Sequence, residues 1–405
     1  MAGSILKHGL RPMVPRDPGE HRAASPLELF FDLVFVVAVS FSSQQLHHEE
    51  SAGAVGASVL AYLMVFFSIW WAWMNFTWFA TAFDTDDWLY RVTTIVQMGG
   101  VLLLAAGTGP ALAEGDFALV TYGYVIMRLA MVSQWLRAAR HAPSHPTALR
   151  YAAGITVVQI AWLVRLALPE QTGIATFLIL VVAELAVPVW AERHGTTAWN
   201  AHHIAERYSL FTLILLGESI LASANAIAEA FQGDEAGGAG AASAGHIWGL
   251  VDISIAGLLV AAGMWWVYFA REQHQHITSL SSSLRFGYFH YVIFAAAGAY
   301  SAGVEVAVDS VLGHTTLGTV TATATFTIPV AAFLLGIWWL TIRRTLTAGT
   351  NTLYLLGVLV VLAGTLLGAR SMDTSVVGVV LAVVACELPD RRAAGVGGGG
   401  IPLRP

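Results

Sequence analysis

The chain has 405 residues, of which 56% are hydrophobic and only 11% are charged. Soluble domains carry about 25% charged residues, and the deficit here runs along the whole chain, which excludes a soluble protein with one anchor. The net charge of −6 comes without a basic stripe and gives no support to nucleic-acid binding. The single cysteine, Cys386, excludes an internal disulfide and a cysteine-rich metal cluster.

Long apolar runs follow one another along the sequence. They approach the 20 or so residues that a membrane-spanning helix needs, and they lack the alternation of barrel strands. Because only helices and closed barrels satisfy the backbone in lipid, we predict an all-α, polytopic integral membrane protein. Twelve spans are predicted, at residues 27–46, 55–80, 88–108, 116–138, 149–168, 172–191, 207–230, 248–270, 286–307, 318–342, 352–369 and 373–388.

The segments outside these spans are mostly short. Residues 1–26 form a polar N-terminal segment without the pattern of a cleaved signal peptide. Residues 233–245 read as a flexible loop and the Gly-rich tail at 391–405 as disordered. With the N-terminus inside, most of the 20 Lys and Arg residues, among them Arg22 and Arg207, fall in inner loops. Because cytoplasmic loops are enriched in these residues, both termini are predicted to be cytoplasmic.

The second half of the chain echoes the first. Glu184 and Glu387 each stand in a Val-Ala-(Cys)-Glu-Leu context, and tryptophan pairs recur at corresponding places in the same order. An even number of helices in each half gives both halves one orientation, as in transporters with parallel repeats. We therefore predict two parallel six-helix repeats, at 27–200 and 201–390.

Two separated motifs carry a resemblance to a known family. The first span opens with Leu27–Val36 (LELFFDLVFV), after Arg16-Asp17-Pro18 and His21-Arg22, and the second motif is Glu206–Phe211 (ERYSLF), followed by Leu216–Ser219 (LGES). Both motifs resemble the bacterial low temperature requirement A (LtrA) family. The resemblance implies a multi-pass protein of the inner membrane, linked to growth in the cold. It supplies no settled activity and no catalytic residues.

Five ionisable residues inside predicted spans are the candidate substrate- or ion-binding residues. Glu28 and Asp32 lie four apart on one helix face, and two carboxylates so placed favour proton binding. Arg128, Glu184 and Glu218 each lie about a dozen residues into a helix, near the membrane midplane. A cluster would make their burial tolerable, so Arg128 is predicted to pair with Glu184 or Glu218. The alternative is a structural clamp between helices.

Other features have a plainer interpretation. The aromatic run at Trp70–Phe79 favours a membrane-interface belt over a ligand cage. Arg165 is expected to extend to the surface, and Glu387 to be interfacial. Gly364 and Gly368 form a Gly-x-x-x-Gly pair, typical of close helix packing.

Two histidine groups have a spacing that matches no catalytic signature. They are His202-His203 with Glu206, and His274 with His276. Solvated loops are favoured over a metal site, and no motif identifies a cofactor.

The architecture favours a secondary transporter or permease, with proton coupling at the buried acids as one form of it. Partners expected are the lipid bilayer and a small-molecule or ion substrate, and a homo-oligomer is left open. One alternative is a membrane enzyme acting on a lipid or isoprenoid, centred on the histidine groups. Another is a sensor or scaffold without transport. Because no phosphate-binding loop or catalytic pattern occurs, the sequence leans away from an enzyme.

Overall fold

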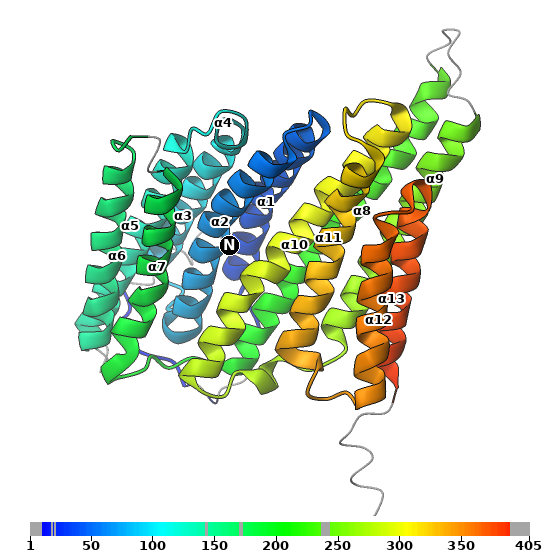
Figure 1. Cartoon of the computed structure of the whole chain (residues 1–405). Coiled ribbons are helices and arrows are strands. Elements are labelled where there is room, and N and C mark those ends of the chain that lie inside the picture. Colours follow the sequence, from blue (N-terminus) through cyan, green and yellow to red (C-terminus); the bar gives the residue numbers. More distant parts are fainter. Residues whose placement is uncertain are drawn as a thin grey trace, which may run out of the picture. The chain divides into compact units, whose positions relative to one another are not determined.

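A computed structural model describes residues 10–17, 19, 22–141, 145–169, 173–235 and 244–388. Within this part of the chain the structure is helical and contains no strand, so the predicted all-α fold is confirmed (Figure 1). The predicted tail at 391–405, residues 1–9, 18, 20 and 21 of the N-terminal segment, and residues 236–243 of the predicted loop lie outside the described residues.

Thirteen α-helices occur in the described residues, and twelve of them coincide with the predicted spans. The additional one, α4, is a six-residue helix. The helices are α1 (Pro26–Ser51), α2 (Val55–Phe83), α3 (Trp88–Ala106), α4 (Thr108–Ala113), α5 (Ala118–His141), α6 (His145–Arg165), α7 (Gly173–Ala191), α8 (Ala201–Glu235), α9 (Ala244–Phe269), α10 (Leu280–Leu312), α11 (Thr319–Ile337), α12 (Ala348–Gly364) and α13 (Ser371–Glu387).

By length and composition, 10 helices of the described chain can cross a membrane. The twelve predicted spans also need α5 and α12. At 17 residues α12 is short but apolar. The 24 residues of α5 are long enough, but Arg128 and Gln134 lower the mean hydropathy of this helix.

The chain divides into two compact units. The first contains residues 1–45 and 57–211, and the second contains residues 46–56 and 212–405. Most residues of α2 are buried, including Trp70, Trp71 and Trp73. Because these side chains are shielded by neighbouring helices, α2 packs in the interior of the described part of the first unit. The predicted pair of six-helix repeats stays a prediction.

Glycines permit close contacts between neighbouring helices in each unit. In the first, α3 and α5 approach at Gly100 and Gly123, where a Cβ on Gly100 would lie 2.7 Å from the Gly123 carbonyl oxygen. In the second, α12 and α13 meet at Gly357 and Gly378. The prediction that Gly364 and Gly368 form a Gly-x-x-x-Gly pair on one helix was wrong. The helix α12 ends at Gly364, and Gly368 lies beyond it with a φ of +55°.

Candidate functional site

One buried carboxylate, that of Glu184 on α7, collects donors from three other helices. Glu184, Trp71 and Arg128 are all buried, with at most 1% of each exposed. Both oxygens of the carboxylate accept hydrogen bonds. The donors are Trp71 Nε1 (2.9 Å) and Arg128 Nη2 (3.0 Å) to Oε2, and Tyr124 Oη (2.7 Å), Gln159 Nε2 (2.8 Å) and Trp162 Nε1 (3.3 Å) to Oε1.

The predicted ion pair of Arg128 is therefore present, and its partner is Glu184. Glu218 belongs to the part of α8 in the second unit and is half-buried. Two other nitrogens of Arg128, Nε and Nη1, are buried without a hydrogen-bond partner among the described residues. Since an unpaired buried charge is costly, the Glu184 contact is the interaction that makes burial of Arg128 tolerable.

The tryptophans of α2 correct a prediction. The interface belt expected at Trp70–Phe79 is absent, because Trp70, Trp71 and Trp73 lie in the middle of a 29-residue helix and are at most 1% exposed. Instead of marking the membrane surface, two of the indoles donate to buried carboxylates, Trp71 to Glu184 and Trp73 to Asp32. These acceptors lie on other helices, so the local sequence around the tryptophans does not reveal them.

A second buried charge cluster lies where α1 and α8 begin. Arg207 donates from Nε to Oδ2 of Asp32 at 3.0 Å and from Nη2 to Oδ1 at 2.5 Å, which is a bidentate pair. The Trp73 indole donates to Oδ1 of the same carboxylate at 2.6 Å. The Trp73 ring stacks on Phe211 with centroids 4.4 Å apart. Asp32 is thus fully hydrogen-bonded although it is fully buried.

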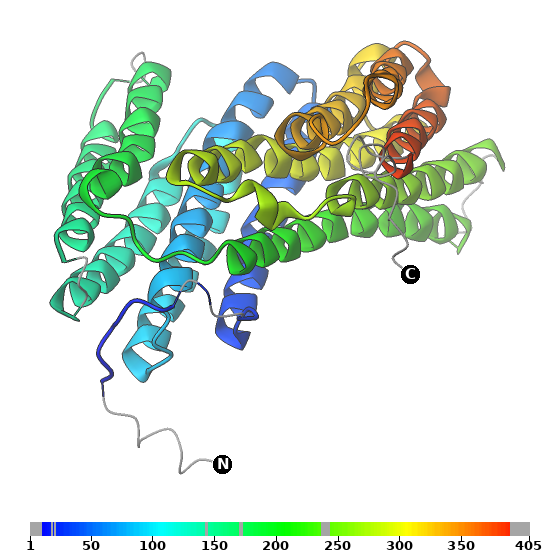
Figure 2. The same ribbon diagram turned by 90° about the horizontal axis from the view of Figure 1, so that it is seen from below.

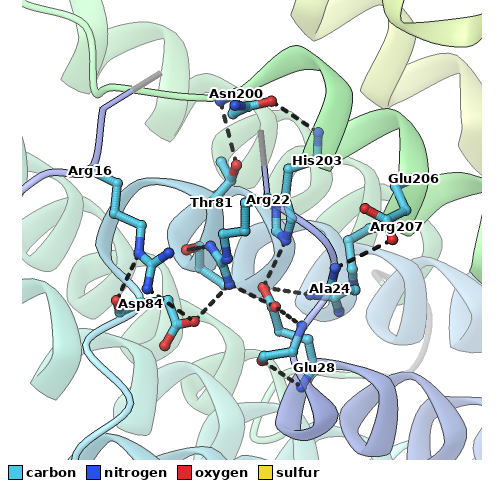
Figure 3. A network of polar contacts seen from close by, with 12 residues as sticks. Arg16, Arg22, Ala24, Glu28, Thr81, Asp84, Asn200, His203, Glu206 and Arg207 are labelled. Carbon is cyan, nitrogen blue, oxygen red and sulfur yellow. Dashed lines mark hydrogen bonds and ion pairs between the residues drawn. The ribbon is translucent and has the colours of Figure 1, made fainter. Parts of the chain in front are cut away.

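Glu28 is held differently (Figure 3). Its Oε2 accepts hydrogen bonds from Arg22 Nη2 and the Ser25 backbone N–H, both at 2.7 Å. Its Oε1 lies 3.2 Å from both His203 Nε2 and Arg207 Nη1, but neither contact has hydrogen-bond geometry. Within the described chain, Glu28 Oε1 and both ring nitrogens of His203 are buried polar atoms without a hydrogen-bond partner.

The segment before α1 closes this cluster. Arg22 also donates to Asp84 Oδ2 at 2.6 Å and to the Ala80 carbonyl at 3.1 Å, at the end of α2. The Ala24 N–H donates to Glu206 at 3.3 Å. Burial raises the pKa of the Asp84 carboxyl in spite of the Arg22 guanidinium beside it.

Local sequence explains how the start of α8 is placed. Asn200 caps the helix by accepting from the His203 N–H at 3.0 Å, and its own N–H donates to Thr81 Oγ1 at 3.4 Å. The cap fixes the first turn of α8 against the end of α2. His203 and Arg207, one turn apart, consequently share the face that points at Glu28.

Sequence reasoning found Glu28 and Asp32 but missed their partners. Arg22 and Arg207 were assigned to inner loops, yet Arg207 is fully buried and the Arg22 side chain is 12% exposed. Both acids of the expected carboxylate pair therefore contact Arg207, and Glu28 also pairs with Arg22. One sequence feature could have suggested the contact between Arg207 and Glu28, because each residue stands in one of the two motifs quoted above.

Other candidate residues lie elsewhere. Arg165 does not simply extend to the surface. It is half-buried, and its guanidinium carbon lies 5.5–5.9 Å from the ring centroids of Phe117, Trp162 and Phe177. Glu387 accepts a hydrogen bond from the Trp266 indole at 2.8 Å.

The two histidine groups have separate surroundings. His203 is buried beside Glu28, whereas His274 lies 3.6 Å from the exposed Glu272. In the described residues no group of three His, Cys, Asp or Glu side chains is arranged to hold a metal ion.

Comparison with known proteins places the chain in a family. The family model described as "Bacterial low temperature requirement A protein (LtrA)" matches residues 23–387. The chain belongs to the LtrA family. An uncharacterized protein of Rhizobium meliloti (strain 1021) is 26% identical over 285 residues, which is 67% of this chain and 64% of that protein. The region matched by the LtrA model begins just before Glu28 and contains the Arg128–Glu184 cluster together with Glu28, Asp32, His203 and Arg207 of the second cluster.

Proposed function

We propose that this LtrA-family protein is a proton-coupled secondary transporter and that Glu28 and His203 form its proton-binding site. The observation that carries the proposal is the contact of Glu28 Oε1 with His203 Nε2, 3.2 Å apart and both buried. Neither atom has a hydrogen-bond partner within the described chain. A proton taken up by His203 would make the imidazole cationic and turn this contact into a buried ion pair with the Glu28 carboxylate.

Several charged side chains surround the pair of Glu28 and His203. The buried groups are the carboxylates of Glu28, Asp32 and Asp84 and the guanidiniums of Arg22 and Arg207. The more exposed Arg16 lies 3.8 Å from Asp84. With Arg16 included, three guanidiniums face the three carboxylates. A proton on His203 would therefore add one positive charge directly beside Glu28, and histidine is the side chain that ordinarily changes charge between pH 5 and 8.

Glu184 is less suited to bind a coupling proton. Its two oxygens already accept five hydrogen bonds, one of them from Arg128. Protonating it would break the ion pair and strand a buried guanidinium, which is costly. We therefore assign Arg128 and Glu184 to a structural clamp that joins α2, α5, α6 and α7, and place the ion-binding role at Glu28.

The substrate-independent test is proton binding by the reconstituted protein. Proteoliposomes on a solid-supported membrane receive a step from pH 7 to pH 6, and the transient current reports charge entering the protein. We expect Glu28→Gln and His203→Gln each to abolish the transient. Glu387→Gln, which changes an exposed acid bonded to Trp266, should keep it. Thermal unfolding in detergent identifies the variants that remain folded.

A wild-type transient in a folded His203→Gln protein contradicts the proposal. The competing function is a non-transporting scaffold, which the saturated Glu184 clamp favours. For a scaffold we expect no transient in the unmodified protein, and substitutions in either cluster should change thermal stability alone.

A further inference from the structure

A cavity of about 560 Å³ opens at one end of the first unit. It lies between the first turns of α3, the last turns of α5 and the N-terminal segment around Arg11. That segment is pinned by the fully buried Met13 and by the Arg16 N–H, which donates to the Ala82 carbonyl at 2.9 Å. Figure 2 shows the described part of the segment, in dark blue, before the chain enters α1.

Positive charge gathers around this cavity. Its lining includes Arg11, Arg137, Arg140 and His141. The nearby carboxylate of Asp87 is already paired with Arg137. It also accepts hydrogen bonds from the backbone N–H of Arg11 at 3.0 Å and from that of Tyr90 at 2.9 Å. The guanidiniums of Arg11 and Arg140 are exposed and form no ion pair with a described residue. Two uncompensated cations therefore flank the cavity.

The same cavity has an apolar wall. Leu89 on α3 and Leu136 on α5 line it, and Leu136 is 44% exposed. Since α5 ends at His141, Arg140 stands in the last turn of its span and Leu136 lies one turn farther into it, while Leu89 lies in the first turn of α3. A fitting ligand is thus anionic at one end and apolar at the other.

We propose that this cavity binds the headgroup of an anionic phospholipid. Arg11 and Arg140 hold the phosphodiester, and an acyl chain lies along Leu89 and Leu136. Basic pockets between spanning helices at the cytoplasmic surface suit such headgroups, and this end of the unit is the side predicted to be cytoplasmic. The assignment is independent of the proton site, because neither arginine contacts Glu28, Asp32 or their partners.

The test titrates purified full-length protein in neutral detergent with phosphatidylglycerol, and measures bound lipid by native mass spectrometry and the shift in Tm. Phosphatidylcholine and inorganic phosphate are the comparison ligands. The test variant combines Arg11→Gln with Arg140→Gln and leaves the Arg137–Asp87 pair intact. Arg91→Gln is the matched control, because Arg91 is exposed near the same end of α3 but is paired with Asp86 at 2.8 Å.

We expect phosphatidylglycerol to bind and to raise Tm, with phosphatidylcholine and phosphate having little effect. The double variant should bind phosphatidylglycerol about 30-fold more weakly, while Arg91→Gln behaves as wild type. Equal binding by the double variant and the wild type would overturn the site. A Tm shift with inorganic phosphate as large as that with lipid would overturn the assignment to a phospholipid.

Discussion

Arg207 binds Asp32 through two guanidinium nitrogens, although 175 residues separate the two in the chain. The pair joins the start of α8 to α1 and is completely buried. Each residue stands in one of the two motifs that relate the chain to its family. The two motifs thus contribute opposite charges to one buried cluster.

Removing Arg207 should strongly destabilise the protein. Arg207→Ala leaves Asp32 as an uncompensated buried charge, and breaking a buried pair from one side costs about 3–5 kcal/mol. Thermal unfolding in detergent measures the loss. Arg91→Ala removes an exposed pair and should change the free energy of unfolding by about 0.5 kcal/mol or less. Equal effects of the two substitutions would show that the Asp32 pair does not stabilise the fold.

The Arg128–Glu184 pair should behave as a clamp. We expect Arg128→Ala to destabilise by about 3–5 kcal/mol, and Arg128→Ala combined with Glu184→Gln to recover part of that loss, because the stranded charge is removed. A double-mutant cycle of unfolding free energies measures the coupling. Strictly additive losses would contradict a direct interaction between the two side chains.

Stability should depend on pH through Asp87, the N-cap of α3. Burial raises its pKa, but hydrogen bonds from Arg137 and from the Tyr90 and Arg11 N–H groups outweigh burial and hold the pKa at about 2. The unfolded value is about 3.9. A depressed carboxyl pKa stabilises the folded state above the unfolded value, so we expect about 2–3 kcal/mol to be lost as pH falls from about 5 to 2.

The measurement for Asp87 is unfolding in detergent between pH 3 and pH 6. Asp87→Asn should be less stable at pH 6 and should show a flatter pH profile than the wild type. Asp116→Asn, at an exposed position between α4 and α5, should keep the wild-type slope. An unchanged slope in Asp87→Asn would contradict the assignment.

The predicted topology places the α4–α5 connection outside and the α9–α10 connection inside. Cysteines introduced at the exposed positions Glu114 and Gln275 test it, with the buried Cys386 replaced by alanine. An impermeant maleimide applied to intact cells should label Glu114→Cys at once and Gln275→Cys only after permeabilisation. The reverse order would invert the topology.

The sequence by itself determined the positions of the helices. Length and apolarity are local properties, and lipid leaves the backbone of an apolar run few alternatives to a helix. All twelve predicted spans accordingly coincide with helices, and Arg128 was correctly paired because two opposite charges at similar depth had few other partners.

Only the tertiary structure decided which groups meet. The acceptors of Trp71 and Trp73, the burial of Arg22 and Arg207, and the position of Gly368 outside α12 do not follow from local pattern. A hydrogen bond depends on tenths of an ångström between side chains on different helices, and helix rotation sets that distance. Hydropathy averages over a whole span, so it places a helix along the chain and leaves its rotation open.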